Sequence, residues 1–308
     1  MTGADAFTTP QLREIATGLE FPEGPIAMPD GSTLVVEIRC GKLTRVGADG
    51  SVDVVADLGG GPNGAARGPD GAIYVANNGG FAWSEIGGVM WPFDRERMTN
   101  QPPDFVGGWI DRVDLDTGTH TVLCREYDGY PFCGPNDLVF DREGGFWFTD
   151  FGKQRPRDAD RGSLYYVTAD GTEVRRAAFG LWGPNGVGLS PDGDRVYVAE
   201  SMTGRVLAWD LAGPGVAREP RTVVEATKGH FDSLAVEASG NVVVAAIGEG
   251  LCIVKPDGSG HEYVPLPDAM TTNLCFTGDD LKTARVTLSG RGRLVELDWP
   301  RPGLPLAF

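Results

Sequence analysis

The 308-residue sequence is short of the residues that build several common kinds of functional site. It has three histidines and five cysteines, no two cysteines are spaced as C-x-x-C, and no G-x-S-x-G element is present. These absences exclude a thiolate zinc site and disfavour a serine hydrolase of the nucleophile-elbow type. No apolar run approaches 18 residues, so the sequence predicts no transmembrane helix.

Positive charge is also scarce, because 27 Lys and Arg face 43 Asp and Glu, which gives a net charge of −16. Nucleic acid and anionic membranes need a basic surface, so we expect neither as a partner and expect a small-molecule substrate instead.

The odd number of cysteines and the lack of paired motifs predict buried free thiols in a reducing compartment. Met1 to Pro10 show no secretory pattern, so we expect a cytoplasmic protein. The oligomeric state stays open.

Six segments of the chain repeat one pattern: a polar residue, a short apolar run, a tight turn of the D-G or G-N type, and a β-branched or aromatic run. This pattern is typical of β-hairpins. The polar residues at the head of the repeats, called the anchors below, are Glu23, Asn63, Asn136, Asn185, Asp232 and Asn273. Successive anchors are 40, 73, 49, 47 and 41 residues apart. Four of these spacings match the period of about 40–50 residues of a propeller blade.

The repeat predicts one all-β domain over residues 1–308, a six-bladed β-propeller with four-stranded antiparallel blades around a channel. A β-sandwich is the alternative. The segment from Leu12 to Thr17 has no partner of its own, so we expect it to complete the last blade and close the ring. The long spacing predicts an insertion at about residues 79–108.

The first strand of a propeller blade lines the channel, so six equivalent anchors are expected at one mouth of it. They comprise one Glu, one Asp and four Asn, without His or Cys. An all-oxygen set with two negative charges suits one divalent cation, Ca²⁺ ahead of Mg²⁺, Mn²⁺ or Zn²⁺. The alternative is that each side chain bonds its own backbone in a turn, a role for which Glu23 and Asp232 are the least suited.

The order and spacing of the repeats resemble those of the SMP-30/gluconolactonase/LRE family of six-bladed propellers. The motifs that carry the resemblance are Phe21–Pro25, Gly134–Asp137, Gly183–Gly186, Phe231–Val236 and Thr271–Phe276. The resemblance implies a divalent metal at the channel mouth and hydrolysis of lactones or related esters. It also implies that Glu23, Asn185 and Asp232 are metal ligands, with Asn136 either a fourth ligand or a substrate contact.

The sequence departs from the sugar-lactone members of this family at two places. Gly134 stands where they tend to have Arg, and no acidic residue that would hold sugar hydroxyls is evident after Lys153.

Aromatic residues occur in the insertion and beside the anchors. Together with two of the anchors, they form the predicted substrate contacts: Asn63, Trp83, Trp91, Phe132, Phe151, Trp182, Phe231 and Asn273. We therefore expect a hydrophobic or aromatic lactone or ester. The insertion is interpreted as a lid with glycine hinges or a pocket wall, with a self-packed loop or an oligomer contact as the alternatives.

The candidate catalytic residues are Asp232, as general base, and Asn136. His230 is either a second base or a structural residue. Other chemistry at the same mouth, such as phosphotriester hydrolysis or a condensation of the strictosidine-synthase kind, is the alternative, as is a non-catalytic ligand-binding propeller.

Overall fold

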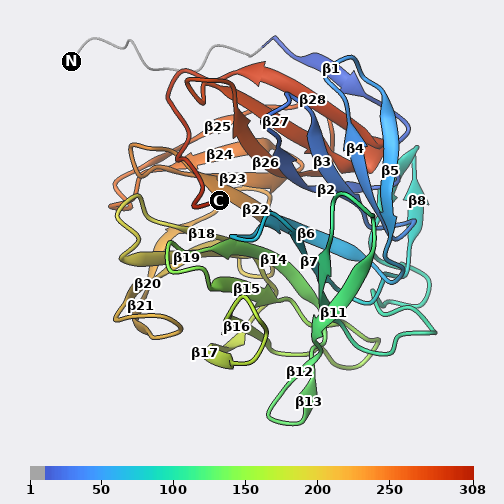
Figure 1. The fold of residues 1–308 in the computed structure, drawn as a ribbon, viewed down its shortest axis with the longest axis vertical. Coiled ribbons are helices and arrows are strands. Elements are labelled where there is room, and N and C mark those ends of the chain that lie inside the picture. The colour runs from blue at the N-terminus through green and yellow to red at the C-terminus, as the bar shows by residue number, and fades with distance from the viewer. Residues whose placement is uncertain (1–10) are drawn as a thin grey trace.

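The computed structural model describes residues 11–308, which form six antiparallel sheets arranged as blades around a central channel (Figure 1). The strands of each blade are given from the channel outward. Blade 1 consists of β2 (Pro22–Ala27), β3 (Thr33–Glu37), β4 (Lys42–Val46) and β5 (Val52–Asp57). Blade 2 consists of β6 (Pro62–Arg67), β7 (Ile73–Asn77), β10 (Trp109–Val113) and β11 (His120–Cys124). Blade 3 consists of β14 (Pro135–Phe140), β15 (Phe146–Asp150), β16 (Gly162–Val167) and β17 (Val174–Leu181). Blade 4 consists of β18 (Pro184–Leu189), β19 (Arg195–Glu200), β20 (Arg205–Leu211) and β21 (Ala217–Glu225). Blade 5 consists of β22 (His230–Val236), β23 (Val242–Ile247), β24 (Gly250–Val254) and β25 (His261–Val264). Blade 6 consists of β26 (Thr271–Thr277), β27 (Thr283–Leu288), β28 (Arg293–Asp298) and β1 (Arg13–Ala16).

The ring closes as the sequence predicts. Strand β1 pairs with β28, so the N-terminal strand becomes the outermost strand of the blade that the C-terminal repeat begins. Ala16 and Leu19 are buried with Leu294 of that blade and with Val35 and Val46 of blade 1. The predicted six-bladed, all-β architecture is confirmed.

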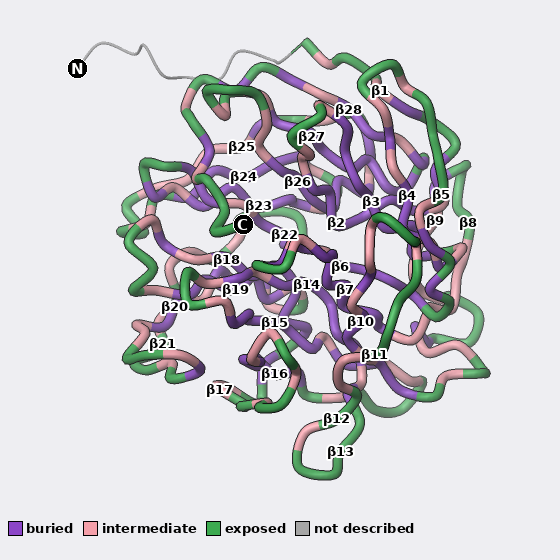
Figure 2. Tube along the Cα trace, in the orientation of Figure 1, coloured by how far each residue is buried: buried purple, intermediate pink, exposed green. Residues whose placement is uncertain are grey.

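The core lies between adjacent blades, where the second strand of each blade is covered on both faces (Figure 2). Strand β15 shows the consequence, because all five of its residues are buried and the first three are aromatic. Tyr74 of blade 2 packs edge-on to Phe140 of blade 3, with 5.0 Å between ring centroids. Full burial of one such ring contributes roughly 2–3 kcal/mol, so these inter-blade contacts hold the ring together.

The other elements are short. The segment between β7 and β10 contains the hairpin β8 (Ser84–Ile86) and β9 (Val89–Trp91), and β12 (Glu126–Tyr127) pairs with β13 (Tyr130–Pro131) in a hairpin that projects from the ring (Figure 1). A 3₁₀ turn, η1 (Ser289–Arg291), precedes β28. Within residues 11–308, no helix has the length and apolar character needed to cross a membrane.

Candidate active site at one mouth of the channel

All six anchors lie near the beginning of the innermost strands β2, β6, β14, β18, β22 and β26, and therefore at the same end of the channel. The pairing of every one of these strands with its neighbour shifts register at or beside the anchor. Such an irregularity breaks the regular alternation of side chains and re-aims the residue that it contains. Five anchors are buried, and Asp232 is partly exposed.

Two pairs of anchors are in contact between adjacent blades. Asn273 donates from Nδ2 to Oε2 of Glu23 over 2.8 Å, although 250 residues separate them in the chain. Asn185 hydrogen-bonds to the carboxylate of Asp232 and accepts at Oδ1 from Ser233 over 3.3 Å. The structure thus brings together residues that the repeat predicts to be equivalent.

Asn136 has an unsatisfied acceptor. Its Oδ1 atom is buried and has no hydrogen-bond partner within the described part of the chain. An unpaired buried acceptor costs about 1–3 kcal/mol, and buried polar atoms without a partner are few in folded proteins. A cation or a substrate donor would satisfy this oxygen.

The site contains a third carboxylate that the sequence analysis missed. Asp137 is buried directly after Asn136, and its Oδ1 accepts from the N–H of Leu138 over 2.9 Å. Burial, followed by the negative charge of Glu23, raises the pKa of Asp137 to about 7. The sequence signal was a difference between repeats, since glycine follows the anchor in the first, second and fourth repeats, at Gly24, Gly64 and Gly186.

The electrostatics of the mouth favour a bound cation. Burial raises the pKa of Glu23 to about 7, against hydrogen bonds that lower it. Burial, with the charges of Glu23 and Asp137, also raises the pKa of Asp232 well above its usual range. Within residues 11–308, none of these three carboxylates forms an ion pair with a lysine or arginine. A positive charge at the mouth would therefore stabilise their ionised forms.

The donor set fits a hard cation only if amide oxygens take part. In the described range, no three His, Cys, Asp or Glu side chains are arranged to hold one metal ion. Glu23 and Asp232 supply two carboxylates, and Asn136 and Asn185 can supply carbonyl oxygens, which Ca²⁺ accepts readily. The unpaired Oδ1 of Asn136 is the observation that supports this set.

A repeated hydrogen bond orients the loops that lead into the anchors. Side chains at the ends of the second strands accept backbone N–H groups from the preceding loop of the same blade. The pairs are Glu37 with Glu20 (2.6 Å), Asn77 with Gly61 (2.8 Å), Asp150 with Cys133 and Gly134 (2.8 and 2.7 Å), and Glu200 with Trp182 (2.7 Å). The acidic or amide residue that ends the apolar run of the second strand in blades 1 to 4 was the sequence signal for this hydrogen bond.

The insertion crosses the anchor mouth from blade 2. Its β8–β9 hairpin turns at Gly87 and Gly88, both with positive φ, as a two-residue turn of this kind requires. Val89 is buried with Phe21 and Met270, which belong to the loops before β2 and β26. Trp83 packs edge-on against Phe21, with 5.0 Å between ring centroids, two residues before Glu23. The insertion therefore forms an aromatic wall beside the anchors.

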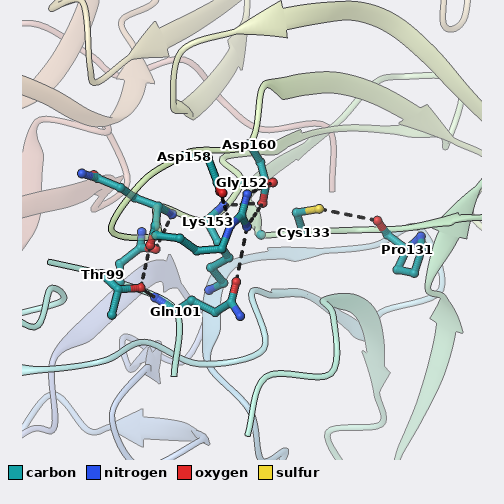
Figure 3. A network of polar contacts seen from close by, with 12 residues as sticks. Thr99, Gln101, Pro131, Cys133, Gly152, Lys153, Asp158 and Asp160 are labelled. Atoms are coloured by element: carbon teal, nitrogen blue, oxygen red, sulfur yellow. Dashed lines mark hydrogen bonds and ion pairs between the residues drawn. The ribbon is translucent and has the colours of Figure 1, made fainter. Parts of the chain in front are cut away.

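The other side of the insertion is fixed to the loop after β15 (Figure 3). Thr99 donates from Oγ1 to the carbonyl of Gln154 over 2.7 Å, and Gln154 donates its N–H to Oδ1 of Asn100 over 2.7 Å. Arg155 reaches Oε1 of Gln101 over 3.3 Å and Oδ1 of Asp160 over 2.6 Å. The insertion is thus held on both sides of the mouth.

Lys153 is the buried centre of this junction. Its Nζ donates to the carbonyl oxygen of Gly80 over 2.6 Å and lies over the rings of Phe81 and Phe105, 4.3 and 5.0 Å from their centroids. Burial lowers the pKa of Lys153 to about 7, and the nearby charge of Asp150 opposes that shift. Nothing in the repeat pattern indicated this role, because Lys153 lies outside the predicted strands.

The predicted aromatic contacts divide into two groups. Phe132 and Phe231 are fully buried in the cores between blades, where Phe132 packs on Phe148, so the structure places them away from the mouth. Phe151 and Trp182 lie on the anchor side, partly exposed and 41% exposed respectively, and Arg161 stacks on the Trp182 ring 3.3 Å from its centroid. The sequence alone could not distinguish the buried aromatic residues from the exposed ones, because both kinds lie next to anchors.

His230 lies at the surface. Its side chain is exposed, and Nδ1 lies 3.1 Å from the carbonyl oxygen of Ser201. This contact joins β22 to the loop after β19 and agrees with the structural alternative for His230.

The fold and the mouth define a six-bladed propeller with an oxygen-rich site under an aromatic insertion. The chain belongs to the SMP-30/gluconolactonase/LRE-like family, whose model matches residues 21–290. A gluconolactonase of Zymomonas mobilis is 26% identical over 302 residues, which cover 86% of this chain and 75% of that protein. The resemblance seen in the motifs is confirmed.

Solved structures share the fold. A gluconolactonase from Xanthomonas campestris is 24% identical and superposes with a TM-score of 0.75 over 94% of this chain and 89% of that chain. Regucalcin from Agrobacterium tumefaciens, a calcium-binding protein, is 20% identical and superposes with a TM-score of 0.72 over 96% of this chain and 98% of that chain.

Proposed function

We propose that this protein is a metal-dependent hydrolase that opens a hydrophobic or aromatic lactone, or cleaves a related ester, at the anchor mouth. The observation that carries the proposal is the combination of the unpaired Oδ1 of Asn136 with carboxylates that lack a basic partner among the described residues. Membership of the family and the lactonase relative support the reaction class. The occurrence of a calcium-binding protein with this fold supports Ca²⁺.

Glu23, Asn136, Asn185 and Asp232 would hold the ion. When bound, it would polarise the carbonyl of the substrate and stabilise the negative charge that develops on its oxygen. Asn273 keeps Glu23 oriented through its 2.8 Å hydrogen bond. Asn63 and Asn273 are assigned as the polar contacts to the substrate.

The proton transfers are assigned to Asp232. It is the one anchor that is partly exposed, so water can reach its carboxylate. Asp232 takes a proton from the water that attacks the carbonyl carbon, the bond from that carbon to the ring oxygen breaks, and the proton passes to the leaving alkoxide. The product is a hydroxy acid.

The aromatic side chains define the proposed substrate class. Phe81, Trp83 and Trp91 are partly buried in the insertion, and Phe151 and Trp182 lie on the same face of the ring. These rings offer the substrate apolar surface rather than hydroxyl-binding groups. That composition favours a substrate with an aromatic or alkyl body.

A substrate panel tests the proposal. Proton release is measured with the calcium-loaded protein on dihydrocoumarin, an aryl acetate, γ-butyrolactone, gluconolactone and a phosphotriester. We expect kcat/KM to be at least about tenfold higher for dihydrocoumarin than for gluconolactone, the discrimination that about 1.4 kcal/mol of apolar contact supplies. Preference for gluconolactone would contradict the aromatic substrate class, and turnover of the phosphotriester alone would contradict the lactone assignment.

A further inference from the structure

A large cavity lies in the channel on the side away from the anchor mouth. It has a volume of about 1140 Å³, slightly above the usual range for small-molecule sites. Its wall consists of the innermost strands downstream of the anchors, and Asn273 is the one anchor that touches it. Each of these strands contributes small or medium-sized residues to the wall, among them Ala27, Ala65, Val139, Gly188, Ala235 and Cys275, beside larger ones such as Ile26, Leu138 and Leu234.

Larger apolar side chains surround the outer half of this cavity. Met28, Phe140, Leu189 and Phe276 line it near the far ends of the innermost strands. A channel that only holds water gains nothing from such a lining, because apolar surface in contact with water is unfavourable. The cavity therefore has the composition of a binding site for a hydrophobic molecule.

The C-terminal segment covers the far mouth. Trp299 and Arg301 donate from Nε1 and Nε to the carboxylate of Glu237 over 2.8 and 2.7 Å, and Leu304 donates its N–H to the carbonyl of Val236 over 2.8 Å. A side chain at Gly303 would begin 2.2 Å from the Phe276 ring, so only glycine permits this approach.

Beyond this attachment, residues 304–308 all line the cavity, and the chain ends near the centre of the ring (Figure 1). Phe308 packs edge-on to Phe140 of blade 3, with 5.9 Å between ring centroids. Leu306 and Phe308 are 63% and 40% exposed, so their side chains are not packed into the core of the protein. The segment 304–308, called the strap below, spans the opening from blade 5 to blade 3.

The charges of the cavity are predominantly negative. Asp137 touches its inner end, and Asp141, Glu143, Asp192, Asp194 and Asp279 lie around the outer part. Of the four arginines that line it, Arg13 and Arg285 are paired with Glu296, which leaves Arg67 and Arg142 against these carboxylates. Electrostatic complementarity therefore favours a cationic ligand over an anionic one.

We infer that this cavity is a second binding site, in the channel beyond the anchors, that takes a hydrophobic amine and is covered by the strap. The aromatic or alkyl body occupies the apolar wall, and the ammonium group faces the carboxylates. This inference does not depend on the reaction proposed for the anchor mouth.

Two probes of matched shape and opposite charge test the inference. Binding of 1-naphthylmethylamine and of 1-naphthaleneacetate to the full chain is measured by isothermal titration calorimetry. We expect one molecule of the amine to bind per chain, at least about tenfold more tightly than the acetate, a difference of about 1.4 kcal/mol. Absence of saturable binding of the amine, or equal affinity for both probes, would overturn the inference.

Three variants locate the bound amine. Ala27→Phe fills the cavity and should weaken binding at least tenfold, and removal of residues 305–308 should weaken it severalfold and speed dissociation. Trp83→Ala, in the wall of the anchor mouth, should leave binding of the amine unchanged. Melting curves recorded by circular dichroism show whether each variant folds. If Ala27→Phe does not fold, binding of the amine to the truncated chain is the deciding measurement. Loss of amine binding in Trp83→Ala, with no change in the truncated chain, would place the probe at the anchor mouth and refute the second site.

Discussion

Glu23→Gln should lower calcium affinity by at least about 100-fold and turnover by a comparable or larger factor. Mutation of residues that merely orient metal ligands already costs 10–100-fold, and Glu23 is assigned as a ligand itself. The substitution replaces a carboxylate with an amide of the same shape, so the acceptor for Asn273 is retained. Calcium affinity is measured by isothermal titration calorimetry, and turnover by proton release.

The same substitution separates a metal ligand from a structural residue. Burial raises the pKa of Glu23 to about 7, so its ionised form is disfavoured when no cation is bound. We therefore expect metal-free Glu23→Gln to be at least as resistant to unfolding as the metal-free wild type. The rise in Tm that calcium causes in the wild type should be lost in the variant.

Asp53→Asn, on the outer strand β5, is the charge-matched control because Asp53 is exposed. It should keep both calcium affinity and turnover. If Glu23→Gln binds calcium as tightly as the wild type, Glu23 is not a ligand, and the proposed metal site is wrong.

Lys153→Met should raise KM for aromatic lactones about tenfold and change kcat little. The variant loses the hydrogen bond to Gly80 and the two contacts of the Lys153 amino group with the Phe81 and Phe105 rings. Such contacts are worth about 0.5–1.5 kcal/mol each, and about 1.4 kcal/mol corresponds to a factor of ten. Because Phe81 packs on Trp83, a loosened insertion should affect binding of the substrate body more than the reaction.

The pH dependence of stability gives an independent readout of this lysine. Burial lowers its pKa from 10.5 to about 7, so between these values the unfolded chain binds a proton that the folded chain does not. The free energy of unfolding of the wild type, relative to Lys153→Met, should therefore rise as the pH increases from about 7 to about 10. The slope should be at most about 1.4 kcal/mol per pH unit.

Urea unfolding at several pH values measures this slope, and Lys255→Met serves as the control because Lys255 is exposed. Lys153→Arg restores the charge and should recover part of the affinity for the substrate. A flat difference between wild type and Lys153→Met across this pH range would contradict the buried, neutral lysine. An unchanged KM would show that Lys153 does not position the insertion.

The fold could be predicted from the sequence because each blade repeats one pattern at a nearly constant period. The anchors follow from the same regularity, since residues at equivalent places in six repeats must meet around one axis. Closure by the segment that contains β1 followed from a strand with no local partner. These inferences depend only on local patterns repeated many times, which tertiary contacts seldom override.

The rest of the site depends on contacts that local patterns do not encode. Phe132 and Phe151 both flank the third blade, yet Phe132 packs in a core between blades and Phe151 lies partly exposed on the anchor side. The burial of Lys153 depends on Gly80 and Phe105, which the insertion brings across the ring. The cavity closed by residues 304–308 likewise depends on where the chain end crosses the channel.

The most direct test of the central claim is the effect of metal removal on hydrolysis. The protein is treated with EDTA, freed of the chelator, and assayed on dihydrocoumarin while calcium is titrated back. The account predicts that activity falls to background without metal, returns with one calcium ion per chain, and does not return in Glu23→Gln. Full activity in protein shown to be free of metal would contradict the central claim.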